Sequence, residues 1–224
     1  FTEEVNKGNV RVKEIDHLGS VPTLLLENKS LEPVFILDGE HLSGAKQNRT
    51  VNLSILVPAD TTMEIPVSCV EQGRWAYTSE YFFSEGELHF DRGRRLRARN
   101  IAKSLKAANS RQADQDEIWD TISAKEAMMQ SHSRTQSMSN IYQSNIVKLE
   151  EFTKNVEATK HQVGVAFSVG KRIVGFDLFD NKETLKIHIN KLVRSVAIDA
   201  IEKIEEKFER PSLDEVRDFL NSFS

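Results

Sequence analysis

The chain has 224 residues, a formal net charge of -4 and one cysteine, Cys69. This length suffices for one large domain or two small ones with a sizeable core. The charge gives no overall attraction to nucleic acid or an acidic membrane, and one cysteine excludes an internal disulfide. No run of about 18 apolar residues could span a bilayer, and no signal peptide is visible. We therefore expect a reducing, cytoplasmic location, although the first residue is Phe1 and an earlier removed segment stays open.

Residues 1–90 are expected to form a β-rich region of short strands and turns. In residues 51–58 every second side chain is apolar, which is the period of a strand with one buried face. Pro66 cannot donate a ladder hydrogen bond, so its strand is expected either to lie at a sheet edge or to start irregularly. Strands without intervening helices favour an antiparallel layer, either a sandwich or barrel-like. The expected strands cover residues 21–30, 31–40, 51–58 and 63–71.

Residues 91–224 are expected to be rich in helices and to contain a hairpin over residues 163–179. Asp180 and Ser212 each precede a glutamate by three positions and so predict capping boxes. The order of strands, helices, hairpin and helices favours a single α+β domain over 1–224, with the hairpin joining or covering the earlier sheet. The expected helices cover residues 91–111, 114–130, 139–160, a segment from Asp180 toward Ile204 and Phe208, and 212–223.

A polar cluster stands between the apolar segments of residues 37–58 and continues after the next strand. Strand alternation places Arg49 on the face of Val51 and Glu71 on the face of Cys69, where an ionised group needs a partner. We expect Arg49 and Glu71 to pair with each other or with a ligand. Arginine donors suit phosphate, and tryptophan offers a flat surface to a ring. The candidate site residues are Glu40, Gln47, Asn48, Arg49, Glu71, Arg74 and Trp75.

Two interpretations of this cluster stay open. Ion pairs at strand ends and amides in loops often have only structural roles, because they satisfy buried polar groups. Alternatively, the same residues line a pocket for a polar, phosphate-bearing ligand that contains a ring. In that case Glu40 or Glu71 would be the general acid or base, which requires burial to raise its pKa.

Other reactive groups give weaker signals. Cys69 lies on an apolar face, where a lone cysteine is more often a small hydrophobe than a nucleophile. The sequence has no HExxH or CxxC motif and no close histidine pair, so no metal site is expected. Residues 91–111 carry eight basic residues and one acid. The acidic residues that follow favour a solvated helix face over nucleic-acid binding.

Three segments carry unusual motifs: LDGE at 37–40, GAKQNR at 44–49 and IPVSCVE at 65–71, followed by Arg74 and Trp75. With the later stretch GVAFSVGKRIVGFDLFD, they resemble the ARG and rhodanese-phosphatase-superfamily-associated protein domain family over most of the chain. The resemblance implies a link to ADP-ribose and NAD metabolism, through the company of ADP-ribosylglycohydrolases. It favours the polar residues as a site, but it implies no catalytic triad and no metal.

Two functions follow as hypotheses. In the first, the domain binds or processes a nucleotide-like molecule such as ADP-ribose. Arg49 and Arg74 would hold phosphate, Gln47 and Asn48 would orient ribose hydroxyls, and Trp75 would stack on the ring. In the second, it is a non-enzymatic interaction or scaffold domain, whose helices and basic segment dock a protein partner. The sequence leaves enzymatic activity, cofactor and oligomeric state open.

Overall fold

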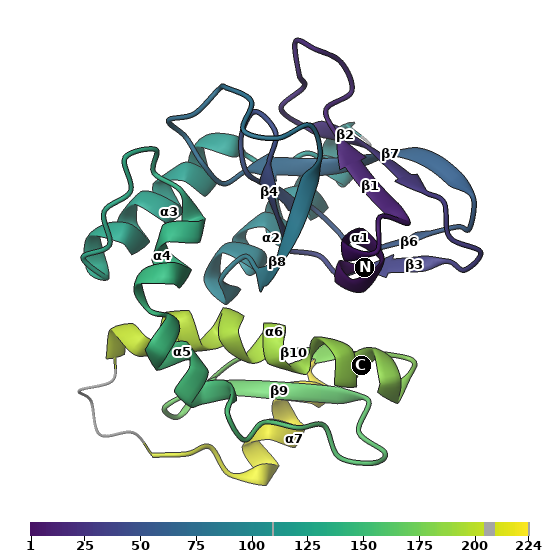
Figure 1. The fold of residues 1–224 in the computed structure, drawn as a ribbon. Helices are drawn as coiled ribbons and strands as arrows, with labels where there is room; N and C mark the ends of the chain where they lie inside the picture. Colours follow the sequence, from purple (N-terminus) through teal and green to yellow (C-terminus); the bar gives the residue numbers. More distant parts are fainter. Residues whose placement is uncertain (109, 204–208, 224) are drawn as a thin grey trace. The chain divides into compact units, whose positions relative to one another are not determined.

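A computed structural model describes residues 1–108, 110–203 and 209–223 of the chain. The chain forms two compact units, Phe1–Ile146 and Val147–Ser224. The expected α+β class is confirmed: a barrel-like antiparallel sheet is followed by helices, a hairpin and further helices (Figure 1). The single domain over 1–224 stays a prediction. Among the described residues, no helix combines the length and apolar character that crossing a bilayer requires.

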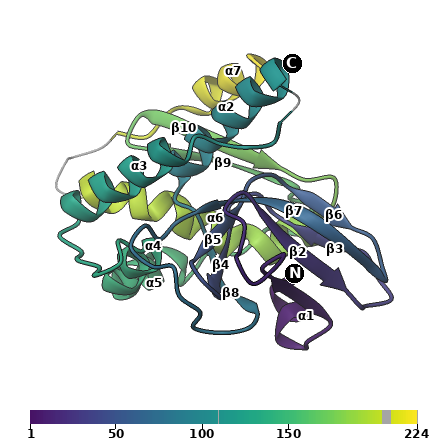
Figure 2. The ribbon, with the colours of Figure 1, turned by 90° about the horizontal axis from the view of Figure 1, so that it is seen from above.

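The first unit is built around a closed barrel of six antiparallel strands. These strands are β1 (Val10–Lys13), β2 (Thr23–Asn28), β4 (Glu40–Gly44), β5 (Arg49–Val51), β7 (Thr61–Cys69) and β8 (Phe82–Leu88). Their order around the barrel is β1-β2-β7-β5-β4-β8, and Figure 2 shows them from above. Closure removes the unpaired edges that an open sheet would expose.

Apolar side chains at alternate positions of these strands form the core of the barrel. Period-2 burial follows from the pleat, which turns successive side chains to opposite faces. Burying one such side chain contributes about 1.5–3 kcal/mol. The pairs that show the alternation are Val10 and Val12, Leu24 and Leu26, and Ile65 and Val67, all at most 2% exposed.

The strand expected over residues 51–58 is instead broken into two strands in different sheets. β5 ends at Val51, and β6 (Ile55–Val57) pairs with β3 (Val34–Ile36) in a separate two-stranded sheet. Asn52 lies at the break. Its Oδ1 accepts from Ser68 Oγ at 2.7 Å, and its Nδ2 donates to a backbone carbonyl at 3.2 Å. These bonds hold the polar residue in place, so the chain leaves the barrel there.

Pro66 does not mark an edge strand, because β7 has a partner on each side. Thr23 of β2 pairs with Pro66, which is the last pair of that ladder. On the other side, Val51 pairs with Val67, where the ladder with β5 begins. Pro66 therefore occupies the position at which β7 passes from one partner to the other, where its missing N–H costs least.

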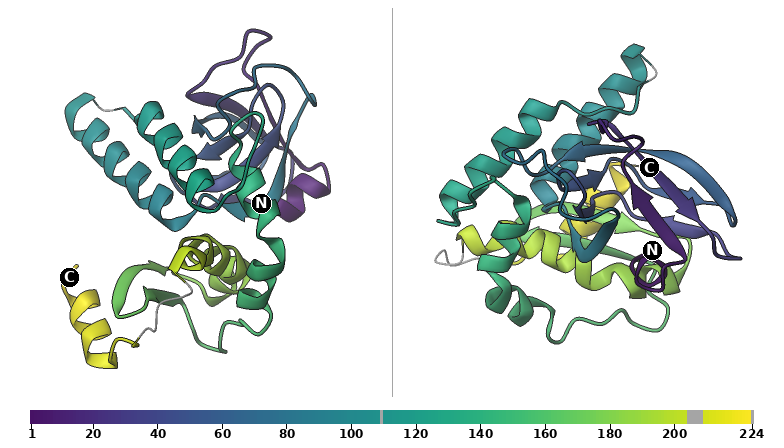
Figure 3. Two further views of the ribbon diagram at one scale, coloured as in Figure 1. Left: turned by 90° about the vertical axis from the view of Figure 1, so that its left-hand side faces the viewer. Right: turned by 45° about the horizontal axis from the view of Figure 1, so that its top comes forward.

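Helices accompany the barrel in the first unit. α2 (Asp91–Ala108) and α3 (Gln115–Met128) run beside each other, as Figure 3 shows. The Asp114 side chain caps α3 by accepting the N–H groups of its first turn. The short α1 (Thr2–Asn6) precedes β1.

The single helix expected over residues 139–160 is also wrong. α4 (Met138–Ser144) and α5 (Ile146–Thr153) are separated by Asn145, whose Nδ2 donates to the Ile141 carbonyl at 2.9 Å. An asparagine side chain that bonds to its own helix backbone competes with continuation of the helix.

Gly93 in α2 is required by its neighbour. A Cβ at this position would lie 2.4 Å from Nε2 of His89, which is fully buried. Gly93→Ala is expected to destabilise the protein by about 1–3 kcal/mol, because overpacking outweighs the better helix propensity of alanine. Chemical denaturation measures the change. Ala98→Gly, on the exposed part of the same helix, should cost about 1 kcal/mol or less. Stabilisation by Gly93→Ala would contradict this packing.

The second unit contains the expected hairpin. β9 (Gly164–Val169) and β10 (Arg172–Leu178) pair with each other, and α6 (Lys182–Ala200) follows, extended by a 3-10 turn over Ile201–Lys203. Within the part of the chain that the structure describes, neither strand is hydrogen-bonded into the barrel. The hairpin therefore forms a sheet of its own and does not join the barrel by strand pairing, whereas the alternative expectation, that it covers the earlier sheet, stays a prediction.

The helix starts of the second unit are set by side-chain caps. Asn181, not Asp180, caps α6 by accepting the Glu183 N–H at 2.9 Å. The capping box of Ser212 and Glu215 is confirmed at the start of α7 (Leu213–Asn221). The expected continuation of the helix at Ile204 and Phe208 lies outside the described residues.

Candidate functional site

Arg74 and Glu71 form an ion pair that is enclosed by protein groups. Arg74 Nε and Nη2 lie 2.9 and 2.7 Å from Glu71 Oε2. The remaining Arg74 donors reach the backbone carbonyls of Gly44 at 3.2 Å, Ala45 at 2.6 Å and Ala76 at 3.0 Å. This guanidinium therefore ties the turn after β4 to the segment after β7.

Asn48 extends the same network to the start of α4. Its Oδ1 accepts from Arg74 Nη2 at 2.9 Å, and its Nδ2 donates to the hydroxyls of Ser137 and Ser139, both at 3.2 Å. The Asn48 backbone N–H donates to Glu71 Oε2 at 3.1 Å. Each polar atom of the Asn48 side chain thus has a protein partner.

The predicted pairing of Arg49 with Glu71 is replaced by the ion pair between Glu71 and Arg74. Glu71 Oε1 accepts from Thr135 Oγ1 at 2.7 Å, and Gln47 Nε2 donates to the Glu71 carbonyl. Burial acts to raise the pKa of Glu71, but the hydrogen bonds from Arg74 and Thr135 outweigh it and lower the pKa. A lowered pKa is the opposite of what a general acid needs at neutral pH.

Glu40 lies apart from this network. It is fully buried at the start of β4, and Gly44, which contacts Arg74, lies at the other end of that strand. Its Oε1 accepts from Ser84 Oγ at 2.5 Å and from Thr2 Oγ1 at 3.3 Å. Glu40 and Glu71 therefore do not face each other as a catalytic pair.

A second group of polar residues stands at one end of the barrel interior, which we call the barrel mouth. It consists of Glu14, Arg49 and Cys69. Glu14 follows Val10 and Val12 on their face, and Arg49 pairs with Cys69 across β5 and β7. Burial lowers the pKa of Arg49, and burial raises the pKa of the Cys69 thiol to about 11. Cys69 is therefore a protonated thiol at neutral pH, not an activated nucleophile.

Glu14 and Arg49 have unused hydrogen-bonding capacity. Arg49 is fully buried and Glu14 is 5% exposed, and Arg49 Nη2 lies 3.8 Å from Glu14 Oε1. Among the described residues, neither Glu14 oxygen has a hydrogen-bond partner, and neither do Arg49 Nε and Nη2. Arg49 Nη1 donates to Gln47 Oε1 at 2.9 Å. Buried polar atoms without partners are uncommon, and they are expected where a ligand or water completes the site.

Lys46 connects the barrel mouth to the loop after β1. Its Nζ donates to the Leu18 carbonyl at 2.8 Å and also to the His17 carbonyl. The same nitrogen lies 5.4 Å from the ring centroid of Trp75 and 5.1 Å from that of Tyr77. Such distances are typical of cation–π contacts, which hold both rings beside the mouth.

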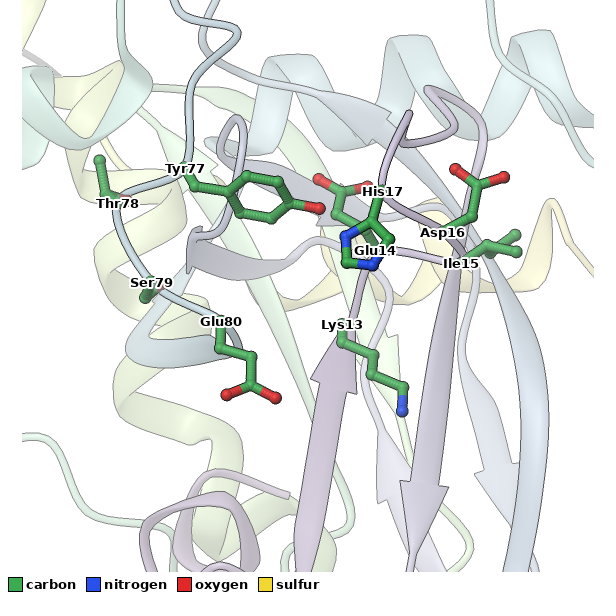
Figure 4. A pocket seen from close by; sticks show the side chains of 9 residues that line it. All are labelled: Lys13, Glu14, Ile15, Asp16, His17, Tyr77, Thr78, Ser79 and Glu80. Atoms are coloured by element: carbon green, nitrogen blue, oxygen red, sulfur yellow. The ribbon is translucent and has the colours of Figure 1, made fainter.

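A cavity of about 720 Å³ opens beside the mouth and is lined by residues 13–17 and 77–80. Figure 4 shows the hydroxyl end of Tyr77 directed toward Glu14 and His17 from the opposite wall. The cavity is large enough for a nucleotide-sized molecule. Its ionisable groups include three carboxylates, of Glu14, Asp16 and Glu80, against the basic side chains of Lys13 and His17.

The structure separates the predicted site residues into three places. Gln47, Asn48, Glu71 and Arg74 hold one another, and Glu40 lies elsewhere. Arg49 and Trp75 stand beside the barrel mouth, with 5.5 Å between the guanidinium carbon and the Trp75 ring centroid.

Sequence reasoning missed Glu14, Lys46 and Tyr77. The signal for Glu14 was available, because it continues the alternation of Val10 and Val12 on an apolar face. No pattern identified the other two.

His41 lies between an acid and a serine, as in a hydrolase triad. His41 Nδ1 is 3.3 Å from Glu85 Oε2, and Nε2 is 3.4 Å from Ser139 Oγ. In a triad the hydroxyl must meet the substrate. Here Ser139 is buried and hydrogen-bonded to Asn48, whereas the Glu85 side chain is 25% exposed. The acid is thus more exposed than the serine, which is the opposite of what a hydrolase triad requires. The arrangement therefore supports a structural role for these three residues.

The basic segment of α2 is only partly a solvated face. Arg94 Nη2 lies 3.0 Å and Arg97 Nη2 lies 3.6 Å from the Asp38 carboxylate, so both arginines turn inward. Burial lowers the pKa of Arg97 to about 10, against the charge of Asp38. The other basic residues of the segment include Arg99, Lys103 and Lys106, which are exposed. Among the described residues, no group of three or more histidine, cysteine or acidic side chains could hold a metal ion.

The comparisons with known proteins agree with the motifs. The family model for the ARG and Rhodanese-Phosphatase-superfamily-associated Protein domain matches residues 1–224, so the chain belongs to this family. No curated protein and no solved structure matches the chain.

Proposed function

We propose that the domain binds a phosphate-bearing, nucleotide-like ligand in the cavity at the barrel mouth, in ADP-ribose- or NAD-linked metabolism and in the cytoplasm. The observation that carries the proposal is the Glu14 carboxylate. It lies on the cavity wall, it is 5% exposed, and its oxygens have no hydrogen-bond partner among the described residues. A ligand with hydroxyl donors would satisfy both oxygens.

The surrounding side chains suit the other parts of such a ligand. Tyr77 offers a ring face on the opposite wall, Lys13 offers positive charge to phosphate, and His17 offers a hydrogen-bonding ring nitrogen. Arg49 lies 3.8 Å from Glu14, with the Trp75 ring 5.5 Å from its guanidinium carbon, and both would act from outside the cavity lining.

The other predicted site residues would act less directly. Gln47, Asn48 and Arg74 would fix the shape of the wall through their mutual contacts. A catalytic form of the proposal, with Glu40 or Glu71 as acid or base, would require the ligand to reach beyond the cavity lining, and product analysis in the same assays tests it.

Thermal-shift titration and calorimetry with ADP-ribose, NAD and AMP test the proposal. A ligand that binds only the folded state must raise the melting temperature. Tyr77→Ala is expected to weaken binding by about tenfold or more, since loss of one stacked base costs about 1–3 kcal/mol. The matched control is Tyr81→Ala, because the Tyr81 ring lies against Arg11 and does not line the cavity.

Absence of stabilisation by all three compounds, in protein that is folded, would overturn the proposal. Equal weakening by Tyr77→Ala and Tyr81→Ala would show that the cavity is not the binding site.

A second candidate is a non-enzymatic interaction or scaffold domain. The closed network of Asn48, Glu71 and Arg74 favours it, because these side chains contact protein groups in the way an internal support does. If Arg49→Ala and Glu71→Ala both unfold the protein and no ligand is detected, this candidate gains. If they leave the fold intact and remove ligand binding, it loses.

A further inference from the structure

Glu14 differs from the other acids of the cavity in its surroundings. Asp16 Oδ1 accepts the backbone N–H groups of Leu18 at 2.9 Å and Gly19 at 2.8 Å, so its carboxylate is occupied by its own loop. Glu80 is exposed to solvent. Glu14 alone of these three acids is both buried and without a hydrogen-bond partner among the described residues. It is therefore the group whose hydrogen bonding a ligand would complete.

The nearby guanidinium of Arg49 offsets the free-energy cost of burying the Glu14 carboxylate. This guanidinium lies 3.8 Å from Glu14 Oε1, close enough to balance the charge, yet the contact leaves both Glu14 oxygens free to accept donors. Arg49 is fully buried and absent from the cavity lining, so it cannot meet a ligand without rearrangement. The surface that the ligand meets at this point is the carboxylate.

A carboxylate in this position matches a vicinal diol. Two adjacent hydroxyls can donate to its two oxygens, as acidic residues do to ribose in dinucleotide-binding folds. A phosphate group at this position has the wrong sign, because it would bring negative charge directly against the buried carboxylate of Glu14. A deoxyribose would leave one carboxylate oxygen buried without a donor.

We infer that Glu14 makes this site selective for ribose with free 2′- and 3′-hydroxyls, against 2′-deoxyribose and against ribose phosphorylated at the 2′ position. The inference rests on the proposed nucleotide-like ligand and names the part of it that enters the barrel mouth. Glu14 acts as a specificity determinant and not as an acid or base.

Calorimetry with AMP, 2′-deoxy-AMP and adenosine 2′,5′-bisphosphate tests the inference, because the three share the base and the 5′-phosphate. The wild-type protein is expected to bind AMP at least about tenfold more tightly than either analogue. Glu14→Gln is expected to reduce both ratios to about threefold or less, mainly by admitting the 2′-phosphate. Glu126→Gln is the matched control, since Glu126 is also buried with an unpartnered oxygen but belongs to α3. It should leave both ratios unchanged.

Each outcome bears on a different claim. Equal binding of the three nucleotides by the wild type overturns the inference while the proposed function stands. A preference that persists in folded Glu14→Gln overturns the assignment to Glu14. Binding of ADP-ribose without binding of AMP overturns the placement of the adenosine ribose here. If none of these compounds binds, the proposed function itself falls.

Glu14→Asp serves if Glu14→Gln does not fold. It keeps the charge and shortens the side chain by one methylene. It is expected to retain rejection of the bisphosphate while it weakens the preference for AMP over 2′-deoxy-AMP. Loss of the rejection in this variant would contradict the electrostatic part of the inference.

Discussion

Replacing Arg74 by methionine is expected to lower the free energy of unfolding by about 3–5 kcal/mol, which is typical for removing one partner of a buried ion pair. The Glu71 side chain is 6% exposed and would lose both the 2.7 Å contact with Arg74 Nη2 and the bond from Nε. Asn48 Oδ1 and three backbone carbonyls would lose donors as well. Urea denaturation measures the loss.

A surface ion pair provides the control for this prediction. Arg95 Nη2 lies 2.7 Å from Asp91 Oδ2, but the Arg95 side chain is 39% exposed. Arg95→Met is expected to cost about 1 kcal/mol or less, because exposed pairs contribute little. If folded Arg74→Met loses no more than Arg95→Met, the network is not a support. Its residues would then be better explained as ligand contacts.

Acid is expected to destabilise the protein through Glu85. Burial acts to raise the pKa of Glu85, but hydrogen bonding and charge from His41, with hydrogen bonds from Ser43 and Ser139, lower it from 4.5 to about 2. A carboxyl whose pKa is lowered on folding stabilises the fold above its unfolded pKa, and this stabilisation is lost as pH falls through the folded pKa. The contribution is about 3 kcal/mol in full. It should disappear progressively between pH 4.5 and about 2.

Denaturation curves at several pH values check this expectation. Glu85→Gln should be less stable than the wild type near neutral pH and should lose less stability on acidification, so that the two profiles converge toward pH 2 to 3. Glu64→Gln, at an exposed position of β7, is the control and should follow the wild type. Parallel profiles of the wild type and Glu85→Gln would contradict the role of this carboxylate. The lowered pKa values of Asp38 and Glu71 act in the same direction and remain in both proteins.

Much of the fold follows from local patterns in the sequence. The hairpin of β9 and β10 is predicted by two apolar runs around a tight turn, and the start of α7 by the serine and glutamate of its capping box. These features depend on neighbours in the chain, so sequence reading reaches them. The break at Asn52 depends on a bond from Ser68, and the position of Pro66 depends on two ladders. Such tertiary causes are invisible to periodicity.

The site illustrates the same limit. Strand alternation identified Arg49 and Glu71 as residues that need partners, and the structure supplies Arg74 as the partner of Glu71. Which of the other site residues lie together depends on how distant strands pair in the barrel. The contact of Glu14 with Arg49 depends on the closed barrel, in which β1 lies beside β2 and β8. Alternation after two valines marks Glu14 as an inward-facing acid, but it does not reveal the partner of that acid.

The number of paired residues between neighbouring strands varies around the barrel. β2 and β7 match over six residue pairs, whereas β1 and β8 meet at one, Val12 opposite Phe82. The contact between β1 and β8 has the fewest paired residues. We therefore expect these two strands to separate first during local unfolding of the barrel. α1 contacts both β1 and β8, and the Thr2 hydroxyl lies 2.8 Å from that of Ser84 in β8. Because Glu14 follows β1 directly, partial separation of β1 from β8 is expected to displace the Glu14 carboxylate at the barrel mouth.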